Sequence, residues 1–295
     1  MRPAWSAEFS PDALRYPDPI PVLDELTPEW AWAGSTGRGV RVAVVDSGID
    51  ADHPALGGMV RGGVAVVEKD GQCTYDETPH GDAFGHGTAC AGIIHSIAPE
   101  AELYSVKVLG ATLSGTGGMF AAGLRWAIEH EMQVLNLSLG TTKREFYAVL
   151  HELADMAYFK NTVLVTAANN FPQPSFPSMY ASVISVASHE EKDPFLFYYN
   201  PAPPVDFGAP GIDVQVPWRG GGYISTTGNS FAAPHISGIV ALILAKHPGL
   251  APYQVKTILR ATAWNVRNRG VGNGDPSQAD RGGSSQAERG VGAEK

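Results

Sequence analysis

The chain has 295 residues, of which 30 are acidic and 21 are basic, so its formal net charge at neutral pH is −9. Proteins that bind duplex nucleic acid are usually basic, so this composition disfavours a nucleic-acid partner. A chain of this length can bury a large hydrophobic core, so it needs no disulfide or structural metal to fold. Its two cysteines, Cys73 and Cys90, make no disulfide framework.

Two further properties exclude a membrane or secreted class at this stage. The longest apolar run, Gly238–Ala245, is much shorter than the about 18–20 residues that cross a bilayer. Residues 1–24 mix acidic residues with prolines and contain no apolar core of a secretory signal. We therefore expect a cytoplasmic protein with no membrane partner.

Short β-rich runs alternate with longer stretches of helical period along the chain. Near-continuous apolar runs predict strands buried on both faces, at Val42–Asp46, Leu103–Val108, Val134–Leu139, Val163–Ala168 and Val183–Ala187. Apolar residues at helical spacing predict helices over 120–128, 146–154, 236–244 and 255–262. This alternation indicates an α/β fold, with a doubly wound, mainly parallel sheet flanked by helices.

The two ends of the chain differ from its middle. Residues 1–25 form a Pro-rich arm, and residues 266–295 are rich in Gly, Ser, Gln and charged residues, which predicts a disordered tail. We expect one folded domain over residues 26–265. The extended segment Tyr16–Pro21 either lies across the active cleft as a weak inhibitor or packs on the back of the domain.

Three motifs carry the residues of a nucleophilic site. Asp46 ends a predicted strand, His86 stands between glycines before a predicted helix, and Ser230 opens another helix. Alone, these residues are ordinary turn, loop and N-cap residues. Together they supply the carboxylate, base and nucleophile of a serine hydrolase, in the order Asp, His, Ser with spacings of 40 and 144 residues.

On these motifs the chain resembles the subtilisin-like serine peptidases (the subtilase family) from about Leu26 to Ala263. The resemblance implies that Asp46 orients the imidazole, His86 is the general base and then acid, and Ser230 is the nucleophile. It also implies that Asn170 stabilises the oxyanion, with the Ser230 backbone N–H as second donor. Asn169 stands where the family usually has glycine.

The same resemblance implies where a peptide or protein substrate binds. Its backbone would lie as an added β-strand between two segments, formed by Leu113, Ser114 and Gly115 and by Ser138, Leu139 and Gly140. Asn169 is expected to narrow or polarise the pocket for the residue before the cleaved bond. The Phe176–Pro177 bond, at one wall of that pocket, is predicted to be cis.

No metal or cofactor is expected. Many secreted relatives bind calcium in a loop that interrupts the helix after the catalytic histidine. Here only Ile93–Ser96 separate Gly92 from the segment Ile97-Ala98-Pro99, and they contain no carboxylate or amide ligand. The acidic stretch Asp70–Asp82 is interpreted as solvated charge. Cys90, one helical turn after His86, is interpreted as a small buried hydrophobe rather than a second nucleophile.

The sequence therefore leaves two functional hypotheses. The leading one is an active serine endopeptidase, similar to intracellular subtilisins and to the peptide-maturation proteases of cyanobactin-type pathways. Its substrates would be intracellular proteins or precursor peptides. The alternative is a catalytically silent protein of the same fold that only binds peptides. The oligomeric state is left open.

Overall fold

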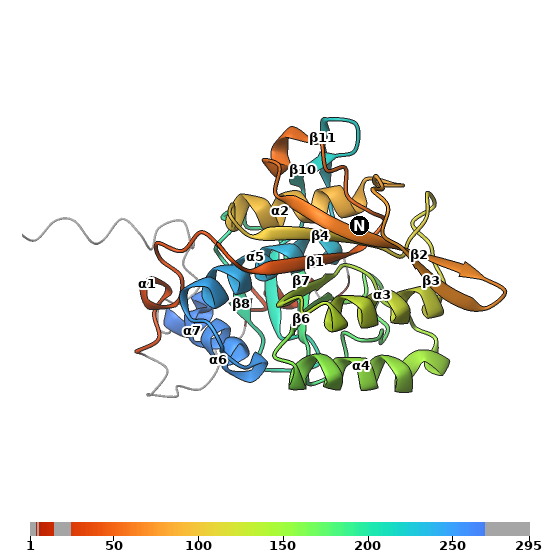
Figure 1. Cartoon of the computed structure of the whole chain (residues 1–295). Coiled ribbons are helices and arrows are strands. Elements are labelled where there is room, and N and C mark those ends of the chain that lie inside the picture. The colour runs from red at the N-terminus through yellow and green to blue at the C-terminus, as the bar shows by residue number, and fades with distance from the viewer. Residues whose placement is uncertain (1–3, 5, 15–24, 269–295) are drawn as a thin grey trace, which may run out of the picture.

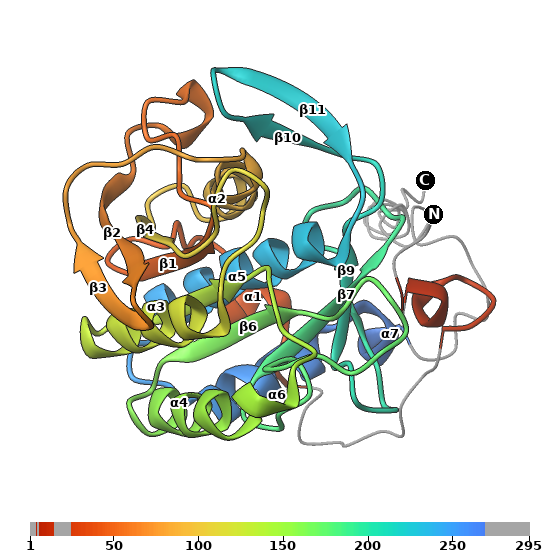
Figure 2. The same cartoon turned by 90° about the vertical axis from the view of Figure 1, so that its right-hand side faces the viewer.

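A nine-stranded, largely parallel sheet forms the centre of the molecule (Figures 1 and 2). The structure is a computed structural model, which describes residues 4, 6–14 and 25–268. The strands of this sheet are β1 (Arg41–Asp46), β2 (Val60–Lys69), β3 (Gln72–Asp76), β4 (Glu102–Lys107), β5 (Val134–Leu137), β6 (Val163–Ala167), β7 (Ile184–His189), β8 (Tyr198–Tyr199) and β9 (Phe207–Pro210). A separate hairpin consists of β10 (Val214–Trp218) and β11 (Gly222–Thr226).

The strand order is β3-β2-β4-β1-β5-β6-β7-β9-β8. The inner pairs are parallel, and the antiparallel pairs β2–β3 and β8–β9 lie at the two edges. After β1 the chain forms β2, β3 and β4 on one side of β1, and it then forms β5 on the opposite side of β1. The direction of winding therefore reverses at β1. Ligand sites of open α/β sheets lie at the carboxyl ends of the strands beside such a point.

Helices cover both faces of the sheet. In chain order they are α1 (Pro28–Ala31), α2 (His86–Ile97), α3 (Gly117–Glu129), α4 (Tyr147–Phe159), α5 (Asn229–Lys246), α6 (Pro252–Thr262) and α7 (Trp264–Arg267). Short 3-10 helices are η1 (Ser6–Phe9), η3 (Pro54–Leu56) and η4 (Arg144–Phe146). Figure 1 shows α2 on one side of the sheet and α3 and α4 on the other.

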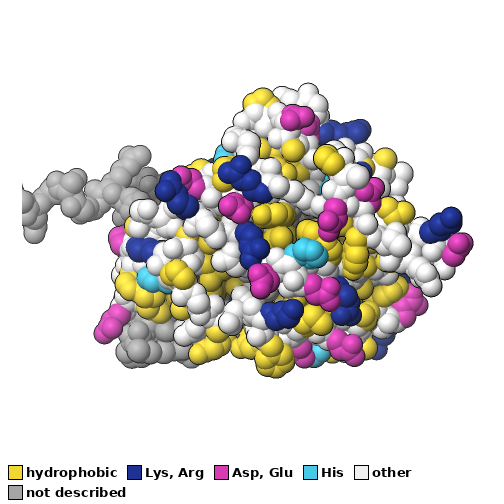
Figure 3. Space-filling model, in the orientation of Figure 1, with side chains coloured by type: hydrophobic (Ala, Val, Ile, Leu, Met, Phe, Trp, Pro, Cys, Tyr) yellow, Lys and Arg dark blue, Asp and Glu magenta, His cyan; other side chains and the backbone are white. Residues whose placement is uncertain are grey.

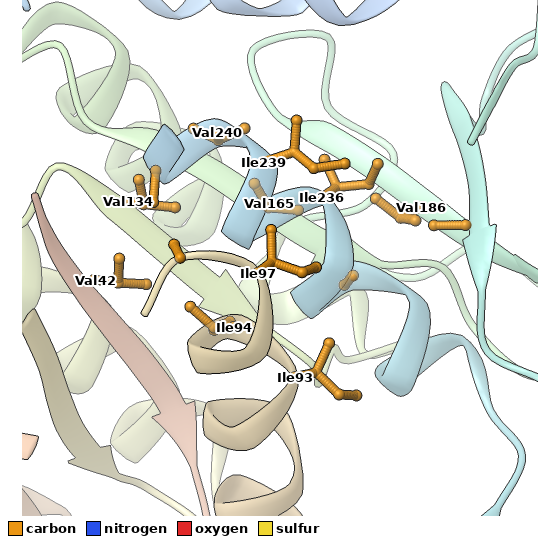
Figure 4. Close-up of a cluster of buried hydrophobic side chains, with 14 of the residues drawn as sticks. Val42, Ile93, Ile94, Ile97, Val134, Val165, Val186, Ile236, Ile239 and Val240 are labelled. Atoms are coloured by element: carbon orange, nitrogen blue, oxygen red, sulfur yellow. The ribbon is translucent and has the colours of Figure 1, made fainter. Parts of the chain in front are cut away.

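Alternate side chains of the strands build two hydrophobic cores. Along β1, Val42 and Val44 belong to the core beneath α2 and α5, whereas Ala43 and Val45 belong to the core beneath α3 and α4. This explains the near-continuous apolar runs, because both strand faces are buried. Figure 4 shows how α2 and α5 meet the strands in the first core, through Ile93, Ile94, Ile97, Ile236, Ile239, Val240, Val42, Val134, Val165 and Val186.

The predicted α/β architecture is confirmed, and the five predicted strands agree with the observed ones to within two residues at each end. The hairpins β2–β3 and β10–β11 were not predicted from the sequence. Their side chains are largely exposed or half-buried, so they lack the continuous apolar run of a central strand. Nor were β8, which has two residues, and β9, which contains Gly208 and Pro210.

The predicted boundary at the C-terminal end needs correction. α7 crosses the expected boundary after residue 265, and Val266 is buried, so residues 266–268 belong to the folded domain. The rest of the predicted tail, residues 269–295, lies outside the described residues. In the predicted arm, η1 packs against the domain with Phe9 buried, while Tyr16–Pro21 also lies outside the described residues.

No helix in the described part of the chain is both long and apolar enough to span a membrane. On the face drawn in Figure 3, basic, acidic and hydrophobic side chains are interspersed. This face therefore lacks the broad basic surface typical of proteins that bind a phosphate backbone.

The crossing of α2 and α5 yields a stability prediction. A Cβ atom at Gly238 would lie 2.8 Å from Cβ of Ile97, so the two helices approach this closely only with glycine. We expect Gly238→Ala to lower the free energy of unfolding by about 1–3 kcal/mol through overpacking, although alanine is the better helix former. Urea denaturation measures this loss. Gly222→Ala, at a site with open space around it, is the control. Equal stability of the two variants would contradict the prediction.

Candidate active site

The end of β1 and the start of α2 bring Asp46 and His86 together. The Nδ1 atom of His86 lies 2.9 Å from Oδ1 and 2.8 Å from Oδ2 of Asp46. Asp46 has no exposed surface, and its Oδ1 also accepts a hydrogen bond from the Ser47 backbone N–H at 2.7 Å. Because a carboxylate can only accept, Nδ1 carries the imidazole proton and Nε2 is left as the basic nitrogen.

Glycine allows this close approach. A Cβ atom at Gly87 would lie 2.1 Å from the carbonyl oxygen of Gly48 and 3.1 Å from Cβ of Asp46. Any larger residue after His86 would push α2 away from the end of β1. The glycine in the sequence motif thus has a steric role, which sets the distance between carboxylate and imidazole.

Asp82, four residues before His86, holds the start of α2. Its carboxylate accepts hydrogen bonds from the backbone N–H groups of Phe84, Gly85 and Thr88 and from the hydroxyls of Ser47 and Thr88. Burial alone would raise the pKa of Asp82, but these hydrogen bonds outweigh it and lower the pKa. The interpretation of Asp82 as solvated charge was therefore wrong.

Ser230 lies in the first turn of α5, and its carbonyl group makes no hydrogen bond within the helix. Pro234 has no N–H, so the Ser230 carbonyl has no helical partner. The hydroxyl of Ser138 donates to this carbonyl instead, at 2.7 Å, and the amide of Asn136 donates to the Ser138 oxygen at 2.9 Å. The end of β5 thereby fixes the backbone of Ser230.

Asn170 follows β6 and faces the same helix start. Its Oδ1 accepts a hydrogen bond from the backbone N–H of Asn229 at 2.9 Å, which leaves the NH₂ end of the amide as the available donor. The side chain of Asn229 is fully buried and donates to the carbonyls of Ala168 and Asn169, and accepts from the backbone N–H of Ser188. One residue thus connects the loop after β6, strand β7 and the start of α5.

A cavity of about 320 Å³ contains the predicted substrate-binding segments. Its lining includes Leu113, Ser114, Gly115, Ser138, Leu139 and Gly140. Asn169 is not part of this lining, and its Oδ1 accepts a hydrogen bond from the Phe171 backbone N–H. Beside the cavity, Thr141 and Phe176 exchange two backbone hydrogen bonds, and the predicted cis bond between Phe176 and Pro177 is confirmed.

Cys90 lies behind the imidazole and is completely buried, as predicted. Its Sγ lies 3.9 Å from Nδ1 of His86 and 3.5 Å from the carbonyl oxygen of Ser230. Burial raises the pKa of this thiol, which argues against a second nucleophile. Asp46, His86 and Cys90 are the one group of three potential metal ligands found among the described residues, but Asp46 already occupies Nδ1 of His86.

The calcium-binding loop that interrupts this helix in many secreted relatives has no counterpart in α2. α2 runs without interruption from His86 to Ile97, and Ala98 follows directly. The helix therefore leaves no loop there to supply the six to eight oxygen ligands that calcium prefers.

The sequence analysis missed four contributors to the site: Asp82, Asn136, Asn229 and Pro234. Two of them carried a signal, because Asn229 directly precedes Ser230 and Pro234 follows it at the spacing that frees its carbonyl. Most donors to Asp82 lie within six residues of it, but Ser47 comes from a distant segment, as does Ser237, which donates to Asn136. Spacing alone could not reveal these distant contacts.

A model of the Subtilase family matches residues 37–292 of the chain. Subtilisin E of Bacillus subtilis (strain 168) is 36% identical over 250 residues, which cover 80% of this chain and 63% of that protein. Subtilisin Savinase of Lederbergia lenta is 36% identical over 244 residues, covering 79% of this chain and 86% of that protein.

A solved structure described as a cold adapted subtilisin-like serine proteinase superposes with a TM-score of 0.64. It is 26% identical and covers 83% of this chain and 93% of its own. The fold, the triad-like motifs and the family match agree over most of the described residues. The chain therefore belongs to the subtilase family.

Proposed function

We propose that this protein is a serine endopeptidase in which Asp46, His86 and Ser230 form the catalytic triad. The observation that carries the proposal is the buried pair of Asp46 and His86, with Nδ1 2.8 Å from Oδ2, whose basic nitrogen is left for a nucleophile. Membership of the subtilase family and the presence of Ser230 in its motif support the same reaction.

In the proposed reaction, Nε2 of His86 takes the proton of Ser230 as its Oγ forms a bond to the substrate carbonyl carbon. The negative charge on the carbonyl oxygen is met by the Ser230 backbone N–H and the NH₂ group of Asn170. His86 then gives its proton to the leaving amine as the C–N bond breaks. A water molecule, deprotonated by His86, releases the acyl group and restores Ser230.

The substrate is proposed to be a peptide or an unfolded protein segment. Main-chain hydrogen bonding to the cavity walls at 113–115 and 138–140 would hold its backbone as an added strand. Such recognition depends little on side chains, so it suits intracellular proteins or precursor peptides of varied sequence. The cytoplasmic location stays a prediction.

Substitution of Ser230 tests its role as the nucleophile. We expect Ser230→Ala to lower kcat on a peptide substrate by about 10⁶-fold, the magnitude known for the subtilisin triad itself. Adding His86→Ala should cost little more, because triad members act as a unit. Circular dichroism controls for the fold. A fluorophosphonate probe that labels Ser230 only in the wild-type protein separates the enzyme from a silent peptide-binding protein, which would not react.

The pH profile tests the base. Burial is the largest single influence and acts to lower the pKa of His86. The charge and hydrogen bond of Asp46, together with Cys90, outweigh it and raise this pKa well above the ordinary value of 6.5. Because the base must be neutral, we expect kcat/KM to rise with pH through a limb above 6.5. Asp46→Asn should move this limb to lower pH. A flat profile between about pH 5 and 9 would exclude His86 as the base.

Asp82 is proposed as a positioning residue for His86. Asp82→Asn keeps its shape but loses the charge that meets five donors, so we expect kcat to fall about tenfold with KM nearly unchanged. Because the folded pKa of Asp82 is lowered, its stabilising effect is present above the ordinary value of 3.8 and is lost as pH falls further. The difference in Tm between wild type and variant should therefore shrink in acid.

The matched control for this variant is Asp76→Asn. Asp76 is an exposed carboxylate that also accepts local hydrogen bonds, from the backbone and hydroxyl of Thr78. Its substitution should leave kcat unchanged. Equal kcat values for the Asp82 and Asp76 variants would remove the positioning role.

A further inference from the structure

The N-terminal segment, defined here as Ala4 and Ser6–Phe9, lies beside the predicted oxyanion residue. Its helix η1 packs against β7 (Figure 2, deep red). Phe9 is only 3% exposed and joins a small apolar cluster with Ala168, Ala187, Tyr198 and Val205. Ala168 stands two residues before Asn170, so this cluster directly supports the loop after β6.

The ring of Phe9 occupies space that Gly208 leaves open. A Cβ atom at Gly208 of β9 would lie 2.5 Å from the ring of Phe9. The ring therefore fits only because position 208 has no side chain. A second anchor is Glu8, whose Oε2 accepts a hydrogen bond from the amide of Asn200 at 3.1 Å.

Ala4 extends this contact to the residues around the oxyanion. Its backbone N–H donates to the carbonyl oxygen of Asn170 at 2.6 Å, and its own carbonyl accepts from Nδ2 of Asn229 at 2.9 Å. Asn229 also donates its backbone N–H to Oδ1 of Asn170 and directly precedes Ser230. Ala4 thus bridges Asn170, a proposed oxyanion donor, and Asn229, which holds the side chain of Asn170 and directly precedes Ser230.

We propose that the N-terminal segment is a positioning element that holds Asn170 and Asn229 in the geometry needed to stabilise the oxyanion. This inference rests on the proposed function. Asn170 itself is exposed near the start of the loop between β6 and β7, so its placement depends on such outside contacts. Donors act fully only when they are held within about 0.5 Å of the productive position.

The contacts of the segment distinguish this role from inhibition. Ala4 and Ser6–Phe9 do not line the cavity that contains residues 113–115 and 138–140. The segment binds backbone and amide groups behind Asn170 and leaves the proposed substrate strand positions open. Its loss should therefore lower kcat and leave KM nearly unchanged, because substrate binding uses other residues.

The test uses two variants of the whole chain, each of which disrupts the contact between Phe9 and Gly208 from one of its two partners. Phe9→Ala removes the anchoring ring, and Gly208→Ala places a methyl group in the space that the ring occupies. Ile258→Ala, which empties a buried position in α6, is the control for a general loss of stability. For each protein we would measure kcat and KM on a chromogenic peptide, Tm, and hydrogen–deuterium exchange of the peptide covering residues 167–172.

We expect kcat to fall at least fivefold in both variants, with KM changed less than twofold and faster exchange over residues 167–172. The double variant should lose no more than the worse single variant, because both act on one contact. The control should lose Tm without either effect. Unchanged exchange, unchanged kcat or a higher kcat/KM in both variants would overturn the proposal.

The same experiment separates this inference from the proposed function. An inactive wild-type protein would refute the endopeptidase proposal. The exchange measurement would then still decide whether the N-terminal segment holds the loop after β6, because it needs no turnover.

Discussion

The buried carboxylate of Asp46 is the constraint around which the site is built. A charge without exposed surface is tolerated only when hydrogen-bond donors surround it, and here the Ser47 N–H and the His86 imidazole supply them. To bring the imidazole this close, α2 must begin against the end of β1, with Gly87 at the contact and Asp82 holding the first turn. The end of β1, the start of α2 and Gly87 therefore together set the short contact between the Asp46 carboxylate and the His86 imidazole.

A second set of contacts fixes the opposite side of the cleft. The start of α5 cannot satisfy its own backbone, because Pro234 removes one helical hydrogen bond. Ser138, which directly follows β5, replaces that bond and is itself held by Asn136 of β5. Asn229 connects α5 to the loop after β6 and to β7. Polar groups buried in this way specify one arrangement strongly, since leaving any of them unpaired costs about 1–3 kcal/mol. The same network thus supports both folding and the placement of Ser230.

The two sides meet because the sheet is wound from β1 in both directions. Asp46, Ser138 and Asn170 follow three neighbouring strands at their carboxyl ends, although they are far apart in the sequence. The helices α2 and α5, which follow β3 and β11 in the chain, place His86 and Ser230 near the same edge, where Sγ of Cys90 lies 3.9 Å from Nδ1 of His86 and 3.5 Å from the Ser230 carbonyl oxygen. A chain with the same motifs in another topology would not bring Asp46, His86, Ser230 and Asn170 to one edge of the sheet.

The sequence by itself determined the α/β class, the central strands and the resemblance that singled out Asp46, His86, Ser230 and Asn170. Those signals are local: apolar runs, helical spacing and short motifs. Only the tertiary structure decided the role of Asp82, which a local reading assigned to solvent, and the contact of Ala4 with Asn170 and Asn229. It also showed that Val266 belongs to the folded domain. A hydrogen bond or packing contact between distant segments depends on which segments the fold brings together, and no periodicity in the chain encodes that.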